Sequence, residues 1–176
     1  MNYLVLTSLF VAFFGYVVGI ILHNTTGKEV EDGKLCLLIF KEFIVLAFIL
    51  MVFYTFNIKI ISMYAAAILA GLFIPGMRYF YFGFIAPFSV LLNFNFSLIS
   101  LIFIYGIPEG SLISKNRKKI QKNILFNFSI FIIGIFISFF LKENIGFLVP
   151  TMAFMLFGSF LSELEKLFWE EKIFKR

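Results

Sequence analysis

The residues of this chain that could do chemistry are few, and they stand in or beside long apolar runs. Lys41 and Glu42 are neighbours near the start of an apolar segment, and Glu109 lies in a Gly-Ile-Pro-Glu-Gly motif. Charged groups are costly inside a membrane, where they commonly serve an ion pathway, a proton relay or a ligand. These residues form a candidate intramembrane or interfacial polar site, to which we add three uncharged polar residues: Asn93, Asn127 and Ser129.

Each of these charged positions has a structural and a functional interpretation. Adjacent helical residues point about 100° apart, so we expect that Lys41 and Glu42 cannot both face lipid or both face the bundle. We expect Lys41 to extend its ammonium to the membrane surface, with Glu42 in the headgroup zone. The alternative turns Glu42 into the bundle as an ion or proton site. For Glu109 we expect a helix end at the interface, against a discontinuous helix of the kind found in transporters.

The sequence excludes most catalytic centres. It has a single Asp (Asp32), a single His (His23) and a single Cys (Cys36), and no Gly-x-Ser-x-Gly or glycine-rich phosphate motif. An intramembrane aspartyl protease needs two aspartates, and a zinc site needs several His, Cys or carboxylate ligands at set spacings. We therefore expect no enzyme, no metal and no cofactor.

Composition indicates a protein embedded in a lipid bilayer. Hydrophobic residues make up 61% of the 176 residues and charged residues 14%. Residues 3–22, 124–141 and 145–161 are uncharged or nearly so, and each approaches the roughly 20 residues that a helix needs to cross about 30 Å of hydrocarbon. The sequence predicts an all-α, polytopic transmembrane helix bundle with no separate soluble domain.

The distribution of Lys and Arg predicts the orientation of this bundle. Cytoplasmic loops carry excess Lys and Arg, and five basic residues cluster within residues 115–122. A break at 93–95 would divide the apolar stretch 79–107 into two spans and place Lys28, Lys34, Lys41 and Arg78 on the same side as that cluster. Seven spans are therefore favoured over six, with the N-terminus outside and the C-terminus in the cytoplasm.

Small residues and a weak repeat bear on helix packing. Ala66, Ala67, Ala70 and Gly71 recur at small-xxx-small spacing, which lets helices approach closely within the bundle or in a homo-oligomer. Two short Gly-containing segments, 71–87 and 134–150, resemble one another at an offset of 63 residues. With seven spans they would run in opposite directions, as in transporters built from inverted repeats.

These observations together define the expected protein. Residues 1–162 form the transmembrane bundle, and residues 163–176 form a charged cytoplasmic helix extension. We expect a multi-pass protein of the cell membrane that binds or transports a small solute, as a homo-oligomer or with a partner membrane subunit. The alternative is a non-transporting assembly or scaffold protein that docks a cytoplasmic partner. The net charge of +5 fits lipid headgroups better than nucleic acid, and the heavy use of Phe, Ile, Lys and Asn is typical of an AT-rich prokaryotic genome.

Overall fold

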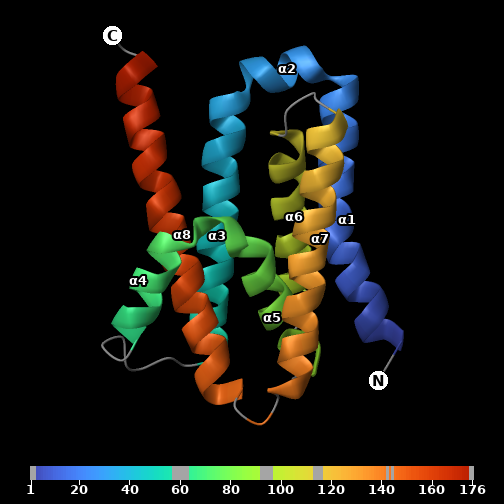
Figure 1. Ribbon diagram of the computed structural model, residues 1–176, viewed down its shortest axis with the longest axis vertical. Coiled ribbons are helices and arrows are strands. Elements are labelled where there is room, and N and C mark those ends of the chain that lie inside the picture. Colours follow the sequence, from blue (N-terminus) through green and yellow to red (C-terminus); the bar gives the residue numbers. More distant parts are fainter. Residues whose placement is uncertain are drawn as a thin grey trace.

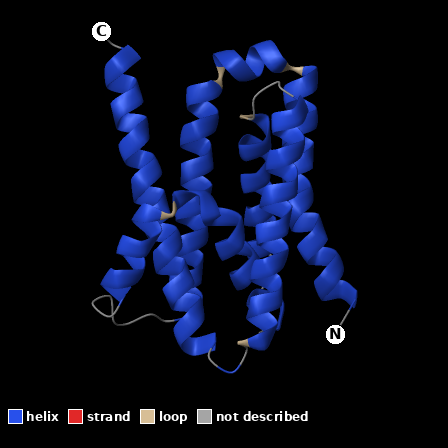
Figure 2. Ribbon diagram, viewed as in Figure 1, coloured by secondary structure: helices blue, strands red, loops and turns tan. Residues whose placement is uncertain are grey.

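The protein is helical wherever its structure is described. The computed structural model describes residues 3–56, 64–91, 97–112, 117–141, 143 and 145–174, and it contains no strand in these ranges (Figure 2). The elements are α1 (Tyr3–Thr25), α2 (Gly27–Asp32), α3 (Lys34–Phe56), α4 (Ala65–Phe73), the 3₁₀ turn η2 (Pro75–Met77), α5 (Arg78–Leu91), α6 (Ser97–Ser111), α7 (Arg117–Phe140) and α8 (Ile145–Phe174). The predicted all-α architecture is confirmed for the described residues.

The long helices run along one common axis (Figure 1). The short helix α2 lies across one end of the bundle, where it joins α1 to α3. The end of α6, the start of α7 and the end of α8 lie at this same end, which we call the α2 end, whereas α1 begins at the opposite end (Figure 1). The start of α7, which belongs to the basic cluster, therefore lies at the same end of the molecule as the end of α8.

Two helices are only half as long as the bundle. The 9 residues of α4 and the 14 residues of α5 span about 13 and 21 Å at 1.5 Å per residue. They meet at η2, which lies near the middle of the bundle's long axis (Figure 1). Pro75 ends α4 because proline disfavours helical geometry at the residue before it, and Ile74 accordingly has φ −126° and ψ 55°. The helix break at Pro75–Gly76 therefore lies inside the bundle.

The outer surface of the bundle is apolar. Within the described parts of the chain, three helical segments are long and apolar enough to cross a membrane, namely Lys34–Tyr54, Ile120–Phe140 and Gly146–Leu167. Two shorter apolar segments accompany them, Phe10–Thr25 and Ser97–Ser111. Large apolar side chains stay exposed along α1, α3 and α7, among them Phe14 (59%), Phe43 (66%) and Phe136 (61%). An exposed apolar surface of this extent is typical of a protein that is surrounded by lipid.

Reciprocal glycine contacts bring α1 and α6 together. A methyl group added at Gly15 or Gly19 would overlap backbone atoms of α6, and one added at Gly106 or Gly110 would overlap backbone atoms of α1. Both pairs have the Gly-xxx-Gly spacing that permits close helix approach in membranes. One interpretation of the motif at 106–110 was a discontinuous helix. The structure instead has a continuous α6 that extends to Ser111, and its two glycines contact α1.

The same device joins α5 to α7 and α4 to α8. Gly83 and Gly134 make the backbone approach in the first pair, and Gly71 and Gly158 in the second. In the predicted small-residue set, Gly71 lies against Met155 and Ala67 is buried, while Ala66 is exposed and Ala70 is half-buried. Gly146, which corresponds to Gly83 at the repeat offset, has open space around it, so the two repeat segments pack differently.

We predict that Gly15→Ala destabilises the protein by about 1–3 kcal/mol, because the new methyl group would overlap the Phe103 carbonyl and force the two backbones apart. Gly146→Ala is the matched control, since no atom lies within 4 Å of its added methyl group. Thermal unfolding in detergent micelles measures both. Equal melting temperatures for the two variants would contradict the close α1–α6 contact.

Candidate functional site

A buried ion pair occupies the middle of the bundle. Arg78 donates from Nη1 to Glu42 Oε1 (2.7 Å) and from Nη2 to Glu42 Oε2 (2.9 Å). The two side chains are 5% and 3% exposed. This fork-to-fork geometry satisfies both carboxylate oxygens and fixes the guanidinium plane.

The local fold explains why Arg78 is buried. It is the first residue of α5, directly after the η2 turn, so its side chain enters the bundle where the two half-length helices meet. There α8 supplies the remaining partner, Ser159, whose Oγ accepts from Arg78 Nε (2.9 Å) and whose carbonyl oxygen accepts from Nη2 (3.1 Å). The guanidinium of Arg78 thus links its own helix, α5, to α3 and α8.

A second ion pair lies beside the first. Lys41 Nζ is 3.1 Å from Glu109 Oε2 and 3.7 Å from Glu42 Oε1, so it bridges the two carboxylates. Tyr105 donates its hydroxyl hydrogen to the same Glu109 oxygen over 3.4 Å. Glu109 is the more open partner, with 29% of its side chain exposed against 10% for Lys41.

Tyrosines form the wall next to these ion pairs. Tyr79 contacts Tyr16 and Tyr105 edge-on, with ring centroids 5.4 and 5.7 Å apart. Asn127 donates from Nδ2 to the hydroxyl of Tyr16 (3.0 Å). The hydroxyl of Tyr79, a residue only 2% exposed, has no hydrogen-bond partner among the described residues. A buried hydroxyl without a partner is costly, and it commonly marks a place for water or a ligand.

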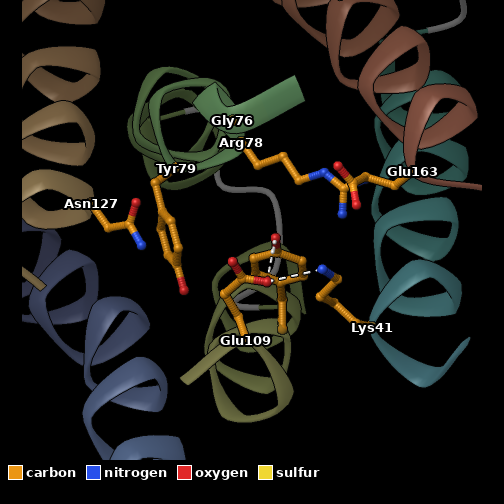
Figure 3. Close-up of a pocket in the computed structure, with 8 residues that line it drawn as sticks. Lys41, Gly76, Arg78, Tyr79, Glu109, Asn127 and Glu163 are labelled. Atoms are coloured by element: carbon orange, nitrogen blue, oxygen red, sulfur yellow. Dashed lines mark hydrogen bonds and ion pairs between the residues drawn. The ribbon is translucent and has the colours of Figure 1, made fainter. Parts of the chain in front are cut away.

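These groups surround an open cavity of about 150 Å³ (Figure 3). Its lining includes Gly76 at the η2 turn, Tyr105 and the following charged or polar residues: Lys41, Arg78, Tyr79, Glu109, Asn127 and Glu163. Figure 3 shows Lys41 and Glu109 joined across the cavity, with Arg78 directed toward the side occupied by Glu163. Residues from α3, α5, α6, α7 and α8 therefore converge on one small polar space.

The structure brings together four of the six predicted polar residues. Lys41, Glu42 and Glu109 belong to one ion network, and Asn127 lines the adjoining cavity. Ser129 is exposed on α7, and Asn93 lies outside the described residues. The expected surface position of Lys41 is wrong, because two carboxylates engage its ammonium in the interior; the alternative inward orientation of Glu42 is the one observed. Both neighbours are buried, so the expectation that they cannot both face the bundle is wrong as well.

Sequence reasoning missed the central residue of the site. The positive-inside rule assigns Arg78 to the cytoplasmic surface, whereas the structure buries it at the η2 turn. The available signal was a lone arginine two residues after Pro75-Gly76 in an otherwise apolar stretch, which indicates an intramembrane charge as readily as a loop. Nothing in the sequence marked Ser159, Tyr16, Tyr79 or Tyr105 as members of the site, because uncharged serine and tyrosine residues also occur in helices without a functional role.

Comparison with known proteins assigns no family. The chain matches no protein-family model, no curated protein and no solved structure. Among the described residues, no group of three or more His, Cys, Asp or Glu side chains is placed to bind a metal ion. The cavity instead offers ammonium, guanidinium, carboxylate, phenol and amide groups, a set suited to binding a small polar molecule.

We predict that Glu42→Gln is far more disruptive than Lys41→Gln. Removal of the Glu42 charge leaves Arg78 buried without a counter-ion, which costs about 3–5 kcal/mol, whereas Glu109 remains partly exposed when Lys41 is lost. Lys166→Gln is the control, because its pair with Glu163 is on the surface and contributes under about 1 kcal/mol.

Thermal unfolding in detergent measures all three variants. The double variant Glu42→Gln/Arg78→Gln is expected to recover part of the loss, since it removes both members of the pair. Equal destabilisation by Glu42→Gln and Lys166→Gln would contradict a buried Arg78–Glu42 pair.

Proposed function

We propose that this chain is a multi-pass cell-membrane protein that binds a small polar solute in the central cavity and transports it. The observation that carries the proposal is a cavity in the middle of an apolar bundle, lined by charged side chains and by the polar side chain of Asn127. Buried polar groups of this kind are expensive unless a ligand or water completes them. A purely structural bundle would be better stabilised by apolar residues at these positions.

The break between α4 and α5 supports a solute pathway. Non-helical backbone at membrane depth is tolerated where it is buried in protein or lines a water-filled space, and Gly76 of η2 lines the cavity. Half-length helices that meet at a binding site near mid-membrane are a recurrent feature of transporters. We therefore propose five membrane crossings, by α1, α3, α6, α7 and α8, and one re-entrant hairpin formed by α4 and α5.

This arrangement keeps the orientation inferred from charge. Lys28 and Lys34 lie on α2 and at the start of α3, and Lys118 and Lys122 lie at the start of α7, so all four belong to the α2 end. By the positive-inside rule the α2 end and the C-terminus are cytoplasmic. The hairpin returns to the side from which it entered, so the N-terminus is outside, as it would be with seven spans.

The cavity is accessible from this cytoplasmic side. Its most exposed acidic members, Glu109 and Glu163, are 29% and 27% exposed, and Glu109 lies in the last turn of α6 at the α2 end. In the other direction the bundle is filled by side chains that are at most 1% exposed, among them Phe48, Phe82 and Ile85. The conformation described here corresponds to a cytoplasm-facing state of the proposed transporter.

The orientation can be tested with single cysteines placed in a Cys36→Ala background. A cysteine at Lys119 and one at Arg176 are both expected to be protected from an impermeant thiol reagent in intact cells and to react after permeabilisation. A cysteine at Asn95, in the segment joining α5 and α6, is expected to react in intact cells. Labelling of positions 119 and 176 from opposite sides would contradict the proposed topology.

Solute binding can be tested by filling the cavity. Gly76 lines the cavity and has no atom within 4 Å of an added Cβ, so Gly76→Leu should occupy the space without disturbing the backbone. We expect at least one member of a panel of small cations, anions and neutral polar solutes to raise the melting temperature of the wild-type protein by several degrees, and to have little effect on Gly76→Leu.

Gly146→Leu is the matched control, because its side chain also enters open space but lies outside the cavity. It should respond to the solute as the wild-type protein does. A panel without any stabilising solute, or equal stabilisation of Gly76→Leu, would count against the central cavity as a binding site and would favour the non-transporting scaffold alternative.

A further inference from the structure

We propose that Glu163 is a second counter-ion for Arg78, and that the buried ion network is a switch with two arrangements. In the arrangement described above, Arg78 pairs with Glu42 on α3. In the second arrangement it pairs with Glu163 on α8. This inference goes beyond the proposed function, because it concerns the ion network itself and depends on no choice of solute.

Arg78 already contacts the turn of α8 that leads to Glu163. Its Nη2 donates to the carbonyl oxygen of Ser159 over 3.1 Å. The α-helical pattern pairs this same carbonyl with the backbone N–H four residues later, which belongs to Glu163. The guanidinium and the backbone of Glu163 therefore meet at one oxygen atom. Because Cα–Cβ bonds in a helix are tilted toward its N-terminus, the Glu163 side chain is inclined toward Ser159 and the guanidinium.

The open cavity gives these two side chains a common space. Both line it, and Figure 3 shows Arg78 directed toward the side occupied by Glu163. Glu163 is paired at present with Lys166, with Oε1 and Nζ 2.7 Å apart. This ion pair is partly exposed, and exposed pairs contribute little to stability. Glu163 can therefore leave Lys166 at a small cost.

Lys41 is placed to take over Glu42 when Arg78 leaves it. Its ammonium nitrogen lies 3.1 Å from Glu109 Oε2 and 3.7 Å from Glu42 Oε1. A small movement therefore changes its main partner from Glu109 to Glu42. Without this replacement Glu42 would be a buried carboxylate with no counter-ion, which is strongly unfavourable.

The groups that lose a partner in the exchange are those that water reaches. Lys166 and Glu109 have 56% and 29% of their side chains exposed. The three charges with little access to water are Arg78, Glu42 and Lys41, which are 5%, 3% and 10% exposed. Each of these three keeps a counter-ion in both arrangements. Interiors with two discrete satisfied arrangements are the physical basis of conformational switches.

The exchange changes which helices are bound to one another around the cavity. At present Arg78 links α5 to both α3 and α8, and the Lys41–Glu109 pair links α3 to α6. In the second arrangement Arg78 links α5 to α8, while Lys41 and Glu42 pair within α3. The exchange therefore releases α3 from its ionic links to α5 and α6, which loosens one wall of the cavity.

The test is a double-mutant cycle in the full-length protein, measured as the melting temperature in detergent micelles. Glu42→Gln removes the present counter-ion of Arg78, so this variant depends on Glu163. Glu163→Gln is expected to lower the melting temperature by at most about 2 °C alone, and by at least about 5 °C when added to Glu42→Gln. Glu165→Gln is the control, because Glu165 is an exposed carboxylate of the same helix that does not line the cavity. Its small effect should be the same in both backgrounds.

Lys166→Gln distinguishes the exchange from a simple surface ion pair. It frees Glu163 from its present partner, so it should raise the melting temperature of Glu42→Gln. This rise should vanish when Glu163→Gln is also present. A surface ion pair with no further role predicts that Lys166→Gln and Glu163→Gln have equal effects in the Glu42→Gln background, and that result would overturn the proposal.

Glu109→Gln supplies a second background that serves if Glu42→Gln does not fold. It removes one partner of Lys41, which then competes with Arg78 for Glu42 and favours the second arrangement. Glu163→Gln should again lower the melting temperature more than it does in the wild-type protein, by a smaller margin than with Glu42→Gln. Purely additive effects of Glu163→Gln in every background that folds would mean that Arg78 has a single counter-ion.

Discussion

The buried pair of Arg78 and Glu42 is the constraint on which the rest of the bundle depends. A guanidinium that is only 5% exposed has little water to solvate it, so its carboxylate partner on α3 and its serine partner on α8 must both stay in register with the start of α5. The interruption that Pro75 imposes between α4 and α5 places Arg78 directly after the turn, at the first residue of α5. The network around the pair costs solvation energy, which its hydrogen bonds offset.

The all-helical fold could be predicted because long apolar runs mark the helices. The apolar runs 3–22, 124–141 and 145–161 fall on α1, α7 and α8. The short length of α4 and α5 was not predicted, because an apolar residue looks the same in a helix that crosses the bundle and in one that ends midway. The Gly-xxx-Gly contacts between α1 and α6 were also not predicted, because the spacing of glycines in one helix does not show which other helix packs against it.

The site was predicted in part for a related reason. Lys41, Glu42 and Glu109 are conspicuous as charges in apolar segments, so their residue types alone made them candidates. Their partners depend on which helices become neighbours, and the contact between positions 42 and 78, or between positions 78 and 159, is a property of the tertiary fold. Charge counting failed at Arg78 because the positive-inside rule describes loops, and this arginine is neutralised internally by Glu42.

The paired glycines have a mechanical consequence. Close backbone contact joins α4 to α8 and α5 to α7. The two half-length helices are thus held by different partners, and the three residues of η2 connect them. A displacement of one helix pair against the other would bend the chain at Pro75–Met77, immediately before Arg78, whose guanidinium joins α5 to Ser159 of α8. The break and the electrostatic link are adjacent in the chain, so such a displacement would strain both at once.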